Sequence, residues 1–158
     1  MQAPLSLLFA ADSTLGKLVK YLRLAGFDTL LDARPPDAAR LNMLAAPHRI
    51  ILTRSVRVKK TIGDAQVIFI RANDPSDQML QVFTELHLQF KDLHPLTRCA
   101  LCNRLLTAVP KDKAQGRVPD YTWQQHCLFK ECPECKRIYW QGTHAKRWMM
   151  RVREKISH

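Results

Sequence analysis

Four cysteines in two closely spaced pairs constrain the fold of this chain more than any other feature. They form the segments Cys99-Ala-Leu-Cys102 and Cys132-Pro-Glu-Cys135, with 29 residues between the pairs. Two such pairs supply four soft thiolates, the ligand set of a tetrahedral zinc ion with Zn–S distances of about 2.3 Å. Because four thiolates leave no coordination position for water, we expect Zn²⁺ to be structural rather than catalytic.

The fifth cysteine, Cys127, has no nearby cysteine, and we expect it to be a small buried hydrophobic residue. An odd cysteine count argues against a disulfide framework, and two pairs in one short segment argue against a redox dithiol. The N-terminal segment lacks the basic region of a signal peptide, and no stretch has the roughly 18 apolar residues that span a bilayer. We therefore expect a cytoplasmic protein that does not contact a membrane.

Positive charge recurs along the chain. Its 158 residues include 25 Lys and Arg against 14 Asp and Glu, which gives a formal net charge of +11. Because this charge is not confined to one tail, we expect a polyanionic partner. RNA is the first candidate, either alone, as tRNA or within the ribosome.

The first part of the chain alternates apolar runs with amphipathic segments, a pattern typical of a parallel sheet with helices on its faces. Strands are predicted at residues 5–10, 29–31, 49–53 and 66–70, and helices at 14–26, 38–46 and 78–90. From about residue 94 the cysteines and prolines dominate. The sequence therefore predicts an α/β domain at residues 1–93, followed by a zinc ribbon at residues 94–158 that ends in a basic helix at 144–156.

A carboxylate directly follows the first predicted strand. Asp12 lies where ligands collect in open parallel sheets, although capping the next helix explains an aspartate there as well. In a basic protein, carboxylates at this edge can hold Mg²⁺ or Mn²⁺ against a phosphate. Asp74 and Asp77 are further candidates, with turn and cap roles as the alternative, and Asp64 is a weaker one.

Several segments together resemble the mut-seven C-terminal ribonuclease domain family. They are Phe9-Ala-Ala-Asp12 with the helix that ends in Leu22-Arg23-Leu-Ala-Gly26-Phe-Asp28, then Ile51-Leu52-Thr53-Arg54, then Asp74-Pro75 with Asp77-Gln78, and Cys132-Pro-Glu-Cys135 with Tyr139-Trp140-Gln-Gly142-Thr-His144. The resemblance covers nearly the whole chain. It implies a PIN-like α/β fold fused to a zinc ribbon, and metal-dependent RNA cleavage by clustered carboxylates. Asp12 matches the family's first acidic position, but Ser55 stands where the family usually has aspartate.

Basic side chains follow two of the predicted strands and occupy the last predicted helix. The candidates for RNA binding are Lys17, Lys20, Arg23, Arg54, Lys59, Lys60, Lys146 and Arg147. Their clustering near strand ends favours a shared groove for phosphates, although Arg23 or Arg54 can instead pair with an acid and serve the fold. Tyr139, Trp140 and Trp148 add rings that suit unpaired bases, with core packing as the alternative for Tyr139 and Trp140.

The leading hypothesis is therefore an RNA-binding protein of the PIN-like ribonuclease class, with phosphodiester hydrolysis assisted by a divalent cation near Asp12. The alternative is a catalytically reduced module that binds RNA or the ribosome and has lost the carboxylate at Ser55. A DNA-binding zinc-ribbon regulator is a third hypothesis, but no recognition helix is evident in the sequence.

Overall fold

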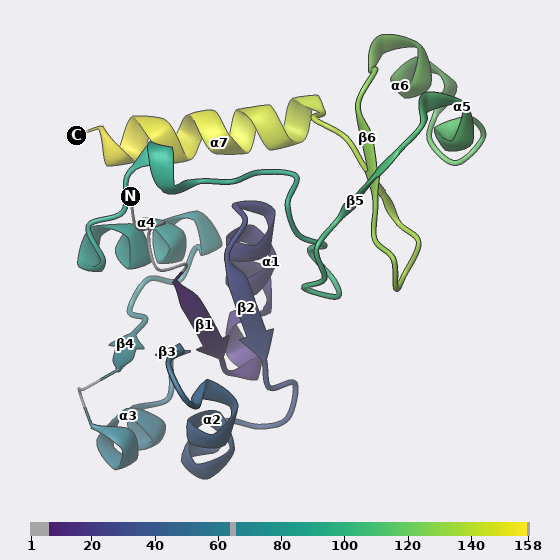
Figure 1. Cartoon of the computed structure of the whole chain (residues 1–158). Coiled ribbons are helices and arrows are strands. Elements are labelled where there is room, and N and C mark those ends of the chain that lie inside the picture. The colour runs from purple at the N-terminus through teal and green to yellow at the C-terminus, as the bar shows by residue number, and fades with distance from the viewer. Residues whose placement is uncertain (1–6, 64–65, 158) are drawn as a thin grey trace, which may run out of the picture.

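A parallel sheet of four strands forms the centre of the first unit (Figure 1). The computed structural model describes residues 7–63 and 66–157, apart from the side chains of residues 143–145. The strands are β1 (Leu8–Ala11), β2 (Asp28–Leu31), β3 (Ile50–Thr53) and β4 (Val67–Phe69), in the order β2-β1-β3-β4. This arrangement confirms the predicted α/β class and leaves β2 as an edge strand.

Helices cover both faces of this sheet. Helices α1 (Gly16–Leu24) and α4 (Pro75–Glu85) share one hydrophobic core with Phe9 and Ala11, whereas α2 (Ala38–Ala45) and α3 (Val56–Ile62) share another with Ala10. Alternate residues of β1 therefore point to opposite cores, as a strand buried on both faces requires. The amphipathic pattern of residues 14–26 is confirmed by α1, which buries its apolar stripe.

Gly26 ends this first helical segment for a steric reason. Its φ is +99°, and a Cβ built on it would lie 2.4 Å from the carbonyl oxygen of His94. Only glycine fits such a position without moving the backbone. The turn after α1 is thereby packed directly against the segment that leads to the cysteines.

The second unit contains a small antiparallel sheet. Its strands are β5 (Thr107–Val109), β6 (Phe129–Glu131) and β7 (Ile138–Tyr139), joined by short helices α5 (Lys111–Ala114) and α6 (Asp120–Gln125) between β5 and β6. Four buried residues form its core, namely Ala114, Val118, Phe129 and Ile138. So small a core favours additional stabilisation by a metal.

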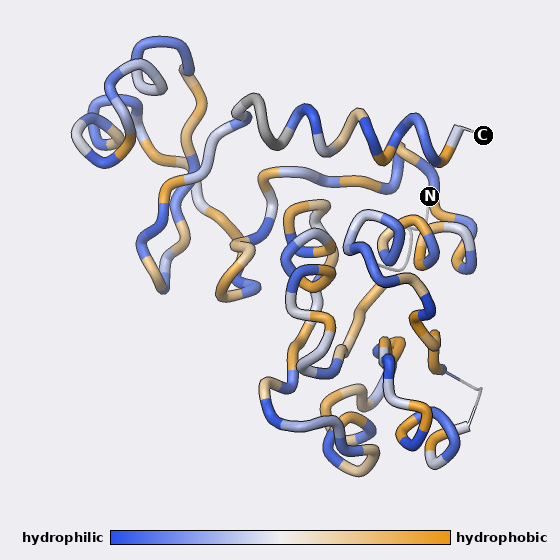
Figure 2. The backbone as a smooth tube through the Cα atoms, turned by 180° about the vertical axis from the view of Figure 1, so that it is seen from behind, coloured by the Kyte–Doolittle hydropathy of each residue, from blue (hydrophilic) through white to orange (hydrophobic). Residues whose placement is uncertain are grey.

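The last helix, α7 (Thr143–Ile156), returns to the first unit. Val152 is buried in the core that α1 and α4 share, and the ring of Trp148 lies 5.3 Å from that of Tyr21. Figure 2 shows hydrophilic and hydrophobic residues alternating along this helix, which fits one face on the core and one face outside. The predicted basic helix is thus confirmed, and it packs on the α/β unit rather than on the antiparallel sheet.

Three expectations need correction. The helix predicted to reach residue 90 ends at Glu85, because the chain turns at His87, whose φ is +53°. Helix α3, which begins directly after Ser55, was not predicted. Cys127 is exposed rather than buried, because residues 126–128 form the connection from α6 to β6.

No helix within the described residues is long and apolar enough to cross a membrane.

Candidate functional site

The four paired cysteines converge on one point, as predicted. Their sulfur atoms all lie within 4.8 Å of one another, and Cys99 Sγ lies 3.7 Å from Cys135 Sγ. A tetrahedron with Zn–S bonds of about 2.3 Å has edges of about 3.8 Å, whereas a disulfide would bring the sulfurs to about 2.0 Å. The donor set and its spacing therefore fit a structural zinc ion and do not fit a disulfide.

Each cysteine pair lies on the same kind of tight turn. The N–H of Asn103 donates to the carbonyl of Cys99, and the N–H of Lys136 donates to the carbonyl of Cys132, both at 3.0 Å. Asn103 and Lys136, each directly after the second cysteine of its pair, have φ values of +60° and +61°. The repeated geometry aims both thiols of each pair at the common centre.

The thiols at this centre titrate very differently from one another. Desolvation raises the pKa of Cys99, but hydrogen bonds from the Tyr139 hydroxyl and from backbone N–H groups outweigh it and lower that pKa to about 7. Desolvation and the neighbouring sulfurs of Cys135 and Cys99 raise the pKa of Cys102 to about 12. Desolvation also raises the pKa of Cys132. Four thiolates packed this closely repel one another, so their joint ionisation calls for a cation such as Zn²⁺.

The first cysteine turn, residues 99–103, docks on the edge of β2. The guanidinium of Arg23 donates to the carbonyl oxygens of Ala100 and Leu101, both at 3.0 Å, and to the carbonyl of Thr29 at 2.9 Å. The side-chain oxygen of Asn103 accepts from the N–H of Thr29 at 3.0 Å. The backbone groups that β2 presents at its free edge are thus used at Thr29 to hold the cysteine cluster against the α/β unit.

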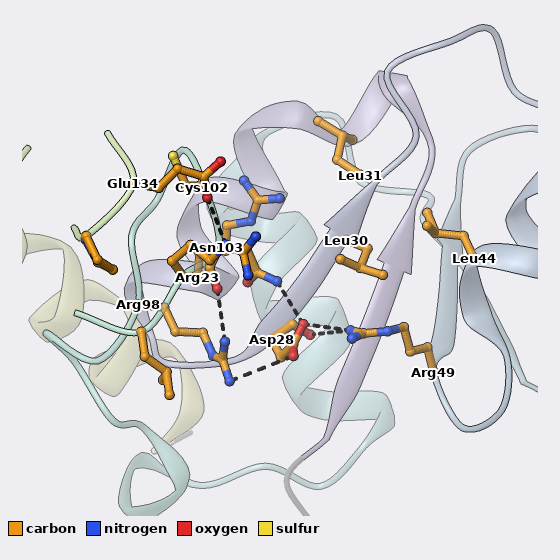
Figure 3. Close-up of a pocket in the computed structure, with 13 residues that line it drawn as sticks. Arg23, Asp28, Leu30, Leu31, Leu44, Arg49, Arg98, Cys102, Asn103 and Glu134 are labelled. Carbon is orange, nitrogen blue, oxygen red and sulfur yellow. Dashed lines mark hydrogen bonds and ion pairs between the residues drawn. The ribbon is translucent and has the colours of Figure 1, made fainter. Parts of the chain in front are cut away.

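A carboxylate completes this junction. Asp28 accepts from Asn103 Nδ2 at 2.8 Å and pairs with Arg49 at 2.7 Å, and Arg98 lies 3.8 Å away (Figure 3). Partial burial raises the pKa of Asp28, but the hydrogen bonds and charges of these neighbours outweigh it and lower that pKa below its ordinary value. Asp28 is therefore ionised and fixed at neutral pH.

Asp12 lies at the carboxyl end of β1, as predicted, and is fully buried. One carboxylate oxygen accepts from the backbone N–H and the hydroxyl of Thr14, and the other accepts from the hydroxyl of Thr53 at 2.5 Å and the N–H of Arg54 at 3.2 Å. Both oxygens of Asp12 thus have two protein donors each. The carboxylate caps the short 3-10 turn Ser13–Leu15 and ties β1 to β3.

The other predicted acids do not gather around Asp12. Asp74 caps α4 and is exposed, and Asp77 is paired with Lys155 of α7. Ser55 caps α3 by accepting from the N–H of Val58. Asp64 lies outside the described residues. Within the part of the chain that the structure describes, the four cysteines alone form a group of at least three acidic, His or Cys side chains close enough to share a metal ion.

The predicted basic residues fall into two groups and one exception. Lys17 and Lys20 are exposed on α1, and Lys146 and Arg147 are exposed on α7 beside the contact of Trp148 with Tyr21. Lys59 and Lys60 belong to α3 on the opposite face of the sheet, where Lys59 lies over the ring of Phe69, and Arg54 directly follows β3 and donates to Asn73. Arg23 is the exception: it is buried and its donors hold backbone carbonyls, so it serves the fold, which was the alternative left open for it.

Sequence reasoning missed the residues that join the two units, and a buried acid within the first unit. Asp28 was noted only as part of a motif, and Asn103, Arg98 and Asp32 were not singled out. Asp32 follows β2, is buried and pairs with Arg34 and Arg40. One signal was available for Asn103, because asparagine directly after a cysteine pair is well suited to a positive φ.

Comparison with known proteins gives one match. Residues 8–152 match a family model described as the Mut7-C RNAse domain. The matched range includes the parallel sheet, all four paired cysteines and most of α7. No curated protein and no solved structure matches the chain.

Proposed function

Because the chain belongs to the Mut7-C RNAse domain family, we propose that it is an RNA-binding protein of the PIN-like ribonuclease class with a zinc ribbon as its second unit. The observation that carries this proposal is the basic surface where α7 crosses α1. We call it the α1/α7 surface and define it by Lys17, Lys20, Lys146, Arg147, Tyr21 and Trp148.

A ring contact brings basic turns of α1 and α7 near each other. Lys17 lies one turn before Tyr21 on α1, and Arg147 directly precedes Trp148 on α7. The two rings are 5.3 Å apart, so these basic residues belong to neighbouring turns of the two helices. Closely spaced Lys and Arg side chains bind phosphates by releasing counterions, and this mode of binding does not depend on base sequence.

The zinc ribbon is supported by the chemistry of its donors. Four cysteines from two similar turns approach to tetrahedral distances beside a small antiparallel sheet. Zinc bound there would supply folding free energy to a unit with four buried core residues. Its role is therefore to hold residues 99–103 in the shape that docks on β2.

The acidic residues do not fit Mg²⁺ or Mn²⁺. These cations prefer several oxygen ligands, usually including carboxylates. Asp12 is buried with both oxygens occupied by protein donors, and Ser55 offers a neutral oxygen that already caps α3. We therefore place RNA binding ahead of RNA cleavage and derive no hydrolytic step.

Hydrolysis near Asp12 is the second candidate function. It is favoured by the position of a buried carboxylate at the carboxyl end of the central strand, next to Ser55 at the start of α3. The discriminating variant is Ser55→Asp, because aspartate caps a helix as well as serine does and the fold should survive. Mn²⁺-dependent cleavage that appears only in Ser55→Asp supports a binding protein on a nuclease scaffold. Cleavage by the native protein, lost in Asp12→Asn with folding intact, would establish the enzyme instead.

The proposal is tested by measuring RNA affinity. Labelled single-stranded RNA and a folded tRNA are titrated with the zinc-loaded protein at two salt concentrations. Binding that weakens steeply with salt, and that falls when Lys17 and Lys146 are replaced by glutamate, is the expected result. Absence of binding to either RNA at low salt would overturn the proposal.

A further inference from the structure

A cleft of about 730 Å³ lies between the edge strand β2 and the first cysteine turn (Figure 3). Three leucines line it, namely Leu30 and Leu31 from β2 and Leu44 from α2. Arg104, Leu105 and Pro133, from the cysteine unit, lie on the other side. Arg23, Asp28, Arg49 and Arg98 also line it. Cavities of this size hold small organic ligands.

The backbone of β2 offers hydrogen-bonding groups to this cleft. The N–H of Asp32 donates to Ala11 of the neighbouring strand, so Asp32 faces into the sheet. Since the pattern alternates along a strand, the N–H and C=O of Leu31 face the free edge, as those of Thr29 do. At Thr29 these groups are used by Asn103 and Arg23. At Leu31 a donor and an acceptor lie side by side, which is the pattern that a nucleobase edge can match.

The charge of the lining favours a ligand with a small negative charge. Four guanidinium groups line the cleft with the two carboxylates of Asp28 and Glu134. This small excess of positive charge suits a ligand with one phosphate better than a polyphosphate.

We propose that this cleft binds one nucleotide of single-stranded RNA, with the base against Leu30 and Leu44 and the phosphate at Arg104. The inference rests on the proposed function and adds a base-binding position to the phosphate contacts of the α1/α7 surface. Arg104 suits this role because its side chain is 67% exposed and pairs with Glu134 at 2.7 Å, its one salt-bridge partner among the described residues. An exposed arginine can turn from a carboxylate to a phosphate at little cost.

The first test is nuclear magnetic resonance of leucine methyl groups in the zinc-loaded protein. Addition of adenosine 5′-monophosphate, and separately of single-stranded RNA, is expected to shift the methyl signals of Leu30 and Leu44. Adenosine triphosphate should bind no more tightly than the monophosphate. Tighter binding of the triphosphate would contradict a site for one phosphate.

The second test compares charge reversals. Arg104→Glu should weaken single-stranded RNA binding by about five-fold or more, whereas Lys113→Glu, an exposed residue of the same unit outside the cleft, should change it by less than about two-fold. Arg104→Lys should restore most of the affinity. Unchanged zinc content in each variant excludes loss of the metal centre as the cause.

The two proposals fail in different ways. If RNA binds but neither the two leucines nor Arg104→Glu responds, the nucleotide cleft is overturned and the proposed function stands. If the native protein binds no RNA and the monophosphate shifts no leucine methyl, both are overturned.

Discussion

The hydroxyl of Thr53 donates a hydrogen bond to the carboxylate of Asp12 at 2.5 Å, across the adjacent ends of β3 and β1. This hydroxyl is one of four donor groups that surround the fully buried carboxylate. The family match marks the chain as ribonuclease-like, while this geometry gives its central acid a structural task. The same residue can therefore be essential to the fold whether or not the protein cleaves RNA.

Asp12→Asn should destabilise the protein by about 2–3 kcal/mol, because the amide turns one acceptor into a donor facing N–H and hydroxyl groups. Urea unfolding measures this loss, with Asp112→Asn in exposed α5 as the matched control. An Asp12→Asn variant as stable as the native protein would show that the buried hydrogen bonds contribute little. It would also allow any lost cleavage to be assigned to chemistry.

Cys132→Ser should abolish stoichiometric zinc binding and unfold the antiparallel unit at residues 95–142, because the hydroxyl is a poor replacement for a thiolate. Zinc content and near-ultraviolet circular dichroism measure both effects. Cys127→Ser is the matched control, since Cys127 is exposed and lies outside the cysteine cluster. A fully zinc-loaded Cys132→Ser variant would refute the assignment of the ligands.

Arg23→Gln should lower the unfolding free energy by about 2–4 kcal/mol, because three backbone carbonyls lose a charged donor in a buried place. The first cysteine turn should also loosen from β2. Hydrogen exchange at the N–H of Thr29, which Asn103 holds, reports that loosening directly. Faster exchange there is expected in Arg23→Gln but not in Lys20→Gln, where the native side chain is exposed on the same helix.

The free energy of unfolding should fall in acid, partly because Asp28 becomes protonated. Its pKa is lowered in the folded protein, so its contribution is fully present above the unfolded pKa of about 3.9 and is lost as the pH falls from there through the lower folded pKa. In Asp28→Asn, unfolding free energy should be lower at pH 7 and should decline less steeply between about pH 5 and 3. Identical pH profiles for the two proteins would contradict an ionised Asp28 held by Arg49 and Asn103.

The sequence was sufficient to predict the structural features that depend on a local pattern of residues. Alternating apolar runs predicted all four parallel strands, and the cysteine pairs predicted the convergence of four sulfurs. The amphipathic residues 144–156 predicted a helix that forms as α7. Each of these features follows from a periodicity or a fixed spacing that extends over several residues, so it does not depend on any single residue.

Long-range contacts account for what the sequence did not predict. Arg23 has the periodicity of an exposed helix residue, yet residues 99–103 cover it from 77 positions away in the chain. The packing of α7 on α1 depends on Tyr21 and Trp148. No local sequence pattern indicates that these two residues are in contact. Asp12 was correctly placed at a strand end, but the four donors that occupy it come partly from β3 and were visible only in the fold.

The most direct test of RNA binding is the anisotropy of a labelled single-stranded RNA, measured with the zinc-loaded protein at about 50 and 200 mM salt. The account predicts salt-dependent binding that drops about ten-fold or more in the Lys17→Glu, Lys146→Glu double variant. The double variant Lys113→Glu, Arg137→Glu removes equal charge from exposed positions of the antiparallel unit and should bind nearly as well as the native protein. Equal loss in both double variants, or no binding by the native protein, would contradict an RNA-binding α1/α7 surface.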